Sequence, residues 1–328
     1  MKNKNLIFVA IFDRDTSFLN RLIPEIRVLS ADGRYTITLL LLTSIQNYYF
    51  FGKNRLALKQ IVQLFDGLGI KSVIVPVKIS GVSPIFQLIS FPYRILRTFL
   101  FILKTKSEIC HVHSIEAGIL ASFLKPILKY KIVFESHGAV VEEILLRKKY
   151  PLKFLSAWFA GLEEWITVLA SDKIICVSHA LKLYLRGKYS KTRNKDYFIL
   201  PSGIIPKDYK NYLNDRKTLR KSMGLNNKFI VVFSGDFHEW QRTEDVIRWC
   251  RQIKNIDKDS FFLILSNEKP EKIYDIFLRH KISKVELLIK SVSYFEIPKL
   301  LSIADLGLLP RRRLKVNEVA SPLKLSEY

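Results

Sequence analysis

The chain has 328 residues, of which 48% are hydrophobic and 12% aromatic, enough for two packed domains and too apolar for a disordered protein. Its net charge of +23 suggests a polyanionic partner: nucleic acid, anionic lipid or phosphorylated small molecules. The basic residues are scattered, and neither an aromatic RNA-binding signature nor zinc-finger spacing occurs, so we expect no nucleic-acid partner. Cys110, Cys176 and Cys250 lie far apart, which favours buried thiols in a reducing compartment over disulfides.

Short apolar runs typical of strands alternate with segments whose apolar residues recur at helical spacing. The first series of runs covers 6–12, 36–42, 72–75, 109–112, 131–135, 173–177 and 197–200. The first of these is short and lacks a cleavage-like site, so we interpret it as a strand and not as a signal peptide. A second series covers 229–234, 261–266, 285–289 and 306–309. The alternation predicts an α/β protein with parallel, doubly wound sheets.

The interval between the two series, 201–227, is polar and rich in turn residues. We therefore predict two Rossmann-like domains, residues 1–203 and 204–328. Two such sheets in tandem are expected to form a cleft at the carboxyl ends of their strands, where open α/β sheets bind ligands.

The segment Ile85–Lys104 combines large apolar side chains with Pro92, Arg94 and Arg97, which makes it a poor spanning helix. One interpretation is a basic amphipathic helix that lies on a membrane surface. The other is a core-facing helix with a solvated basic edge. The stretch Leu145–Trp165 allows the same two interpretations.

The end of the chain predicts a buried strand at 304–310, then a basic loop with Arg311, Arg312, Arg313 and Lys315, then a helix start. Ser321 suits the N-cap and Pro322 the first helical position. Free N–H groups at a helix start, with arginines nearby, predict an anion site. The carboxylate of Glu327 follows about one and a half turns later and is expected to reach a ligand hydroxyl.

Seven segments resemble glycosyltransferase family 4 in order along the chain. They are Cys110–Ser114 (a His-x-His strand end), Phe134–Gly138 (a strand ending in His-Gly), Ala170–Ser178, Leu200–Ile204, Phe233–Gly235, Ala304–Gly307 and Ser321–Tyr328.

This resemblance implies a GT-B fold whose first domain binds the acceptor and whose second domain binds a nucleotide sugar. It implies transfer of a sugar from a UDP- or GDP-linked donor, with retention and without an essential metal or other cofactor. We expect a glycan or lipid-linked acceptor in surface polysaccharide biosynthesis. The enzyme is expected to be cytoplasmic and peripheral on the anionic inner face of the plasma membrane. Because relatives continue past the last helix, we expect a C-terminally truncated chain with low stability and little activity.

The resemblance also implies residue roles in the second domain. Glu327 corresponds to the glutamate that holds the ribose hydroxyls, while the position of the family's first glutamate, eight residues earlier, is Val319. Gly235 and the helix start are expected to approach the donor phosphates. The residues expected at the donor are Gly235, Arg242, Ser321, Pro322, Leu323, Lys324 and Glu327, with Arg311, Arg312 and Arg313 as further diphosphate contacts.

In the first domain, His137 corresponds to the histidine that faces the donor sugar and is the expected catalytic residue. His111 and His113 are expected to be structural, because we expect them to alternate on one strand and not to face the cleft together. We expect no metal site. Asp13 and Arg14, in a loop that lacks the family's paired glycines, are expected on the acceptor side. Asp13-Arg14-Asp15 spells a metal-binding Asp-x-Asp, but it follows the first strand directly, which is the wrong place for that motif.

Two other functions stay open. A nucleotide-sugar epimerase or hydrolase needs converging acid–base groups, for which Glu116, Glu135 and His137 are the candidates. A non-catalytic binding or scaffold protein is suggested by Val319, Asp236 and Gln241, because these occupy positions where the family has functional residues.

Overall fold

The computed structural model describes residues 3–12, 19–44, 48–49, 52–78, 84–146, 152–235, 237, 242–292 and 296–328. The chain forms two compact units, Met1–Pro201 with Glu318–Ser321, and Ser202–Asn317 with Pro322–Tyr328. The first crossing lies two residues before the division expected from the sequence, and four residues near the end return to the first unit.

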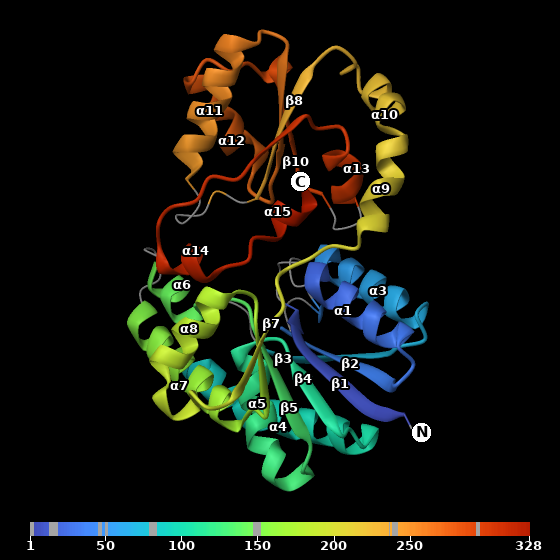
Figure 1. The fold of residues 1–328 in the computed structure, drawn as a ribbon, viewed down its shortest axis with the longest axis vertical. Helices are drawn as coiled ribbons and strands as arrows, with labels where there is room; N and C mark the ends of the chain where they lie inside the picture. Colours follow the sequence, from blue (N-terminus) through green and yellow to red (C-terminus); the bar gives the residue numbers. More distant parts are fainter. Residues whose placement is uncertain are drawn as a thin grey trace. The chain divides into compact units, whose positions relative to one another are not determined.

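The first unit is built on one parallel sheet of seven strands (Figure 1). In spatial order these are β3 (Lys71–Lys78), β2 (Tyr35–Ser44), β1 (Lys4–Phe12), β4 (Ile109–Val112), β5 (Lys131–Ser136), β6 (Lys173–Cys176) and β7 (Asp196–Ile199). All seven apolar runs of the first series are strands, which confirms that prediction. The strand order reverses direction between β1 and β4, and ligands bind beside such a switch point in open α/β sheets.

Helices cover both faces of this sheet. They are α1 (Leu19–Ala31), α3 (Gly52–Asp66), α4 (Pro84–Thr105), α5 (Ile115–Leu128), α6 (Val140–Leu146), α7 (Lys153–Ala170) and α8 (His179–Lys188), with a 3₁₀ turn η1 (Ser190–Thr192). Because crossovers are right-handed and the strand order runs in opposite directions from β1, α1 and α3 lie on one face and α4, α5 and α7 on the other.

Helix α5 is the most deeply buried helix described in this unit, and it lies between α4 and α7. It passes α7 so closely that a Cβ atom at Gly118 would stand 2.2 Å from Thr167 Cγ2. Serines that follow β4 and β6 cap the next helices: Ser114 Oγ accepts from Ala117 N at 3.1 Å, and Ser178 Oγ accepts from Leu181 N at 2.9 Å. These caps give the serines of two family-like motifs a structural role.

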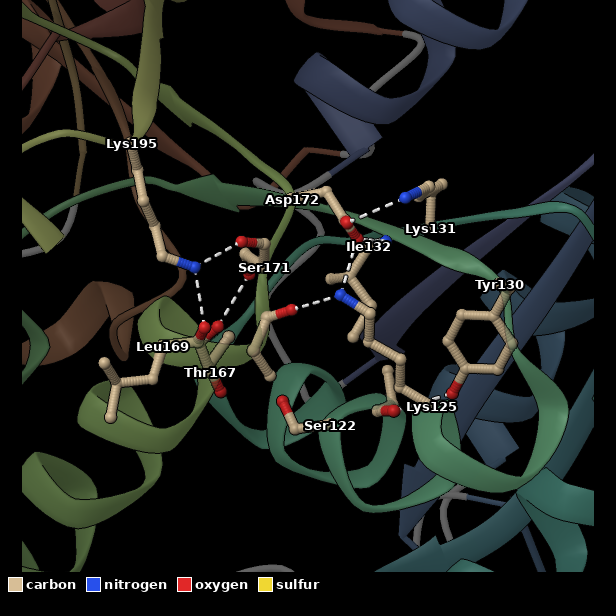
Figure 2. A network of polar contacts seen from close by, with 12 residues as sticks. Ser122, Lys125, Tyr130, Lys131, Ile132, Thr167, Leu169, Ser171, Asp172 and Lys195 are labelled. Atoms are coloured by element: carbon tan, nitrogen blue, oxygen red, sulfur yellow. Dashed lines mark hydrogen bonds and ion pairs between the residues drawn. The ribbon is translucent and has the colours of Figure 1, made fainter.

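A polar network holds the amino ends of β5 and β6 to helices α5 and α7 (Figure 2). Asp172 accepts from Lys125 Nζ at 2.7 Å and from Ile132 N at 2.8 Å. Lys195 Nζ donates to the carbonyls of Leu169 and Ser171, both at 2.6 Å. Asp172, within one of the family-like motifs, therefore has a structural role, because it joins α5 to the start of β5.

The second unit is a parallel sheet of four strands in the order β10 (Leu287–Lys290), β9 (Ser260–Leu265), β8 (Phe229–Ser234) and β11 (Leu306–Leu308). Its helices are α9 (Pro206–Asn214), α10 (Arg216–Ser222), α11 (Thr243–Ile256), α12 (Pro270–Arg279), α13 (Ile297–Leu301) and α15 (Leu323–Glu327), with a 3₁₀ turn η2 (Lys284–Glu286). Asp305 repeats the role of Asp172 here, since Ile230 N donates to it at 2.8 Å. The four strands of the second series are confirmed.

Two details of the predicted end segment were wrong. Strand β11 is only partly buried, with Leu306 exposed, because it is an edge strand of the sheet. A short helix, α14 (Lys315–Val319), replaces the end of the expected loop.

Helix α4 buries some of its polar side chains and exposes some of its apolar ones, and the membrane-surface interpretation stays a prediction. Arg94 and Thr98 are buried, whereas Leu96, Leu100 and Leu103 are exposed. Arg94 lies over the Phe91 ring, with its guanidinium carbon 5.5 Å from the ring centroid. Among the described residues, no helix has both the length and the apolar composition that crossing a bilayer requires.

Candidate functional site

Tyr328 fixes helix α15 at the carboxyl edge of the second sheet. Its hydroxyl accepts from Ser234 N at 3.1 Å and donates to Leu308 O at 3.4 Å, and these two residues end β8 and β11. Its ring packs on Gly307, where a Cβ atom would stand 2.4 Å from Tyr328 Cδ2. The final segment therefore lies at the edge where parallel sheets bind ligands.

Glu327 is buried beside this anchor, with only 6% of its surface exposed. Lys324 Nζ lies 2.7 Å from Glu327 Oε2 as an ion pair. Neither carboxylate oxygen accepts a hydrogen bond of good geometry from the described residues. A buried carboxylate with unused acceptor capacity is costly to keep, and it is suited to accept from ligand hydroxyls.

The predicted cap of α15 was wrong by one position. Pro322 is the N-cap, with an extended ψ of 113°, and Leu323 is the first helical residue. Ser321 stands before the cap and belongs to the first unit, whereas Pro322 begins the return to the second. Because Pro322 has no acceptor in its side chain, no side-chain hydrogen bond caps α15.

Arg242, Arg312 and Arg313 line one cavity of about 260 Å³ in the second unit. Glu244 and Asp245 line it as well, and Asp245 forms ion pairs with Arg242 and Arg248. Three arginines against two carboxylates leave an excess of positive charge, which favours an anionic ligand.

Arg311 lies apart from that cavity lining and is partly buried. Its Nη1 donates to Asn317 Oδ1 at 3.0 Å, while its buried Nε has no hydrogen-bond partner among the described residues. Burial lowers the pKa of Arg311. The structure thus brings Arg312 and Arg313 to Arg242, whereas Arg311 contacts Asn317; the diphosphate role expected of the three loop arginines stays a prediction.

Other residues predicted for the donor side have mixed outcomes. Gly235 follows β8 and donates its N–H to Leu265 O at 2.9 Å. Val319 is buried in the hydrophobic core of the first unit, where its carbonyl accepts from Ser178 Oγ at 2.6 Å. A glutamate at that position would be buried in that core. Asp13, Arg14, Asp236 and Gln241 lie outside the described residues.

His137 follows β5 in the first unit and touches Arg21 of α1. An Arg21 Nη1–H donates to His137 Nδ1, and Glu135 Oε1 lies 3.6 Å from the same nitrogen. Because arginine has no acceptor, Nδ1 carries the lone pair and Nε2 carries the proton. Burial, opposed by Glu135 and reinforced by Arg21, lowers the pKa of His137 to about 4. His137 is therefore a neutral ring whose Nε2–H is a hydrogen-bond donor.

The expectation that His111 and His113 do not face the same way was wrong. Residues two apart on a strand lie on one face, and the two rings stack with centroids 4.6 Å apart. His113 also stacks on His137 at 5.5 Å. Glu135 contacts the rings of both His111 and His113: its Oε2 lies 3.2 Å from His111 Nε2 and 3.4 Å from His113 Nδ1.

Sequence reasoning missed two residues of α1, Arg21 and Glu25, that face these histidines. Glu25 Oε2 lies 3.4 Å from His113 Nε2. Burial, together with the nearby Glu135 carboxylate, raises the pKa of Glu25. One signal could have indicated them: Arg21 and Glu25 are oppositely charged, lie four residues apart on one helix, and stand among apolar residues (Leu22, Ile23 and Ile26) that are buried. Glu116 is in the first turn of α5.

Residues 54–207 match the family model described as Glycosyltransferase Family 4. No curated protein matches the chain significantly. Solved structures share the fold: HepE from Anabaena in complex with UDP and glucose is 11% identical, with a TM-score of 0.64, and the match covers 96% of this chain and 76% of that one.

Sucrose-phosphate synthase from Thermosynechococcus elongatus is 10% identical with a TM-score of 0.68, over 94% of this chain and 76% of that one. UDP-GlcNAc 2-epimerase from Neisseria meningitidis bound to UDP-GlcNAc is 12% identical with a TM-score of 0.57, over 92% and 76%. At these identities the likeness establishes a common fold.

Proposed function

We propose that this chain is a family 4-like glycosyltransferase of the GT-B fold, and that it moves a sugar from a UDP- or GDP-sugar to a glycan or lipid-linked acceptor. The product belongs to surface polysaccharide biosynthesis, and the transfer retains configuration. The observation that carries the proposal is the buried carboxylate of Glu327 at the carboxyl edge of the second sheet, whose oxygens accept no hydrogen bond from the described residues.

In this proposal Glu327 accepts from the ribose hydroxyls of the donor. Hydrogen bonds to a buried charged acceptor are strong, so this contact selects a nucleotide. Arg242, Arg312 and Arg313 bind the diphosphate in their shared cavity. Their charge stabilises the leaving diphosphate as the glycosidic bond breaks, so the transfer needs no metal ion. His137 is the catalytic residue in this proposal.

A calorimetric screen of UDP- and GDP-sugars against the full chain tests the proposal. We expect one donor class to bind, and we expect Arg312→Gln with Arg313→Gln to weaken that binding at least tenfold. Arg279→Gln, an exposed arginine of α12, is the matched control and should leave binding unchanged. Absence of binding across the whole panel would instead support a non-catalytic scaffold.

A second candidate is a nucleotide-sugar epimerase. One support is the fold shared with a UDP-GlcNAc 2-epimerase. The other is the proximity of two acid–base groups, because Glu135 Oε1 lies 3.6 Å from His137 Nδ1. Incubation with the donor alone separates the two functions, because an epimerase converts the donor without an acceptor. We expect the donor to keep its configuration.

We further propose that the enzyme works on an anionic membrane surface. Large apolar side chains are exposed on three neighbouring helices of the first unit: Leu96, Leu100 and Leu103 of α4, Phe123 and Ile127 of α5, and Phe154, Trp158 and Trp165 of α7. Exposed basic residues on or beside these helices include Arg97, Lys104 and Lys129. Aromatic and aliphatic groups next to cations fit the headgroup region of an anionic leaflet.

Flotation with phosphatidylglycerol vesicles tests this surface at low and high salt. Wild type should float with the vesicles, and Phe154→Ser with Trp158→Ser should remove most of that binding. Leu278→Ser on α12, also an exposed apolar residue, should not change it. Flotation of the double variant equal to wild type would contradict the proposed surface.

A further inference from the structure

In the first unit, a cluster of four histidine and glutamate side chains on or next to α1, β4 and β5 has no function assigned so far. Glu25, His111, His113 and Glu135 each offer one ligand atom, and these atoms all lie within 4.8 Å of one another. They come from three elements: α1, β4 with the residue that follows it, and β5. Three of the four residues are buried, and Glu25 is only slightly exposed.

Two polar atoms in this cluster have no hydrogen bond. His113 Nε2 and Glu25 Oε2 are buried and lie 3.4 Å apart, yet neither has a hydrogen-bond partner among the described residues. The His113 side chain is 3% exposed, so bulk solvent does not reach it. An orphaned buried imidazole nitrogen is costly, and a ligand bound at this nitrogen would offset that cost.

The spacing of the atoms suits a metal ion. Zinc binds imidazole nitrogen and carboxylate oxygen at about 2.0–2.2 Å in a tetrahedron, which places neighbouring ligand atoms about 3.3–3.5 Å apart. Two pairs already have this spacing, with 3.4 Å between Glu25 Oε2 and His113 Nε2 and 3.2 Å between His111 Nε2 and Glu135 Oε2, and the remaining pairs lie within 4.8 Å, so the side chains must draw together to bind an ion. Two imidazoles and two carboxylates form a ligand set that zinc accepts.

We propose that Glu25, His111, His113 and Glu135 bind one Zn²⁺ ion. Four protein ligands in a buried place leave no open position, so the ion is structural. It joins helix α1 to strands β4 and β5 and thereby supports the segment that carries His137. The proposal does not depend on sugar transfer, because no step of that reaction uses the ion.

Arg21 is the cation that faces the same carboxylates, and it distinguishes a metal site from a purely polar cluster. Its charge repels an incoming ion. Replacing it with neutral Gln should therefore raise zinc affinity, whereas removing a ligand should lower it. A cluster that merely packs would show no such opposite pair of effects.

The test uses the full chain, stripped with chelator and titrated with Zn²⁺ by calorimetry. We expect one ion per chain. Glu25→Gln and His113→Gln should each weaken binding about a hundredfold or more, because even groups behind the ligands contribute about 10- to 100-fold. His179→Gln, an exposed histidine at the start of α8, is the control and should bind as wild type does. Unchanged affinity in both ligand variants would overturn the proposal.

Zinc X-ray absorption on the wild type keeps the test independent of variant folding. We expect four nitrogen or oxygen neighbours at about 2.0–2.2 Å and no sulfur. Sulfur at about 2.3 Å would assign the ion to the cysteines and overturn the proposed site. Binding of less than one ion per chain would overturn it as well.

Discussion

Gly307 and Tyr328 depend on each other, because the ring occupies the space where a side chain at Gly307 would begin. We predict that Gly307→Ala displaces the ring and breaks its hydrogen bonds to the ends of β8 and β11. Overpacking of this kind costs about 1–3 kcal/mol. Hydrogen–deuterium exchange should therefore become faster across 323–328.

The control for that exchange experiment is Gly187→Ala in α8, where a new Cβ atom meets nothing within 4 Å. Its exchange should stay as in wild type. Unchanged protection of 323–328 in Gly307→Ala would show that Tyr328 does not anchor α15.

Glu286 links stability to pH. Although its partial burial acts in the opposite direction, hydrogen bonds from Lys254 and Ser283 lower the pKa of Glu286 from 4.5 to about 2. Because the folded pKa lies below the unfolded one, the stabilisation is complete above pH 4.5 and is lost as the pH falls toward 2.

We predict that Glu286→Gln destabilises the chain most above pH 4.5, and that its difference from wild type shrinks as the solution is acidified. Urea unfolding between about pH 6 and about pH 3 measures this difference. A difference that stays constant over that range would contradict the assigned pKa.

At the scale of elements, the contact between α5 and α7 requires a residue without a side chain. A Cβ atom at Gly118 would stand 2.2 Å from Thr167 Cγ2, in a place where α5 is buried. We predict that Gly118→Ala lowers the free energy of unfolding by about 1–3 kcal/mol, measured by urea denaturation.

Gly161→Ala in α7 is the matched helical glycine, since its new Cβ atom would make an ordinary contact at 3.9 Å with Val141. Alanine is a better helix former, so this change should stabilise the chain by about 0.5–1 kcal/mol. Equal effects of the two substitutions would contradict the close approach of α5 and α7.

The strands could be predicted from sequence because each is a short apolar run between polar turns, such as Ile109–Val112 and Phe229–Ser234. Helices α14 and α15 are five residues long, too short to show a period, so their limits could not be predicted. The helical position of Pro322 was predicted wrongly for another reason, because the fixed φ of proline suits both the N-cap and the first helical turn.

The candidate sites were only partly predictable. Glu327 and His137 were predicted from motifs and their roles stay predictions, whereas the structure does place Arg242 in one cavity with Arg312 and Arg313. Arg21 and Glu25 were missed because their partners His137 and His113, which follow β5 and β4, lie more than eighty residues away in sequence. Contacts between α1 and β5 follow from sheet order, which no local pattern encodes.

At the scale of the whole molecule, two local groups of basic residues account for part of the net charge of +23. One is the arginine-lined cavity in the second unit, which suits a diphosphate. The other is the set of basic residues beside the exposed apolar side chains of α4, α5 and α7. Both suit an enzyme that takes an anionic donor and works at an anionic surface.

The central claim is that Glu327 holds the nucleotide of the donor. Calorimetric titration of the UDP- and GDP-sugar panel into wild type, Glu327→Gln and the exposed neighbour control Glu318→Gln tests it most directly. Loss of hydrogen bonds to a charged acceptor costs about 1.5–3 kcal/mol, so Glu327→Gln should bind about 10- to 150-fold more weakly, with Glu318→Gln unchanged. Donor binding by Glu327→Gln as tight as that of wild type would contradict the claim.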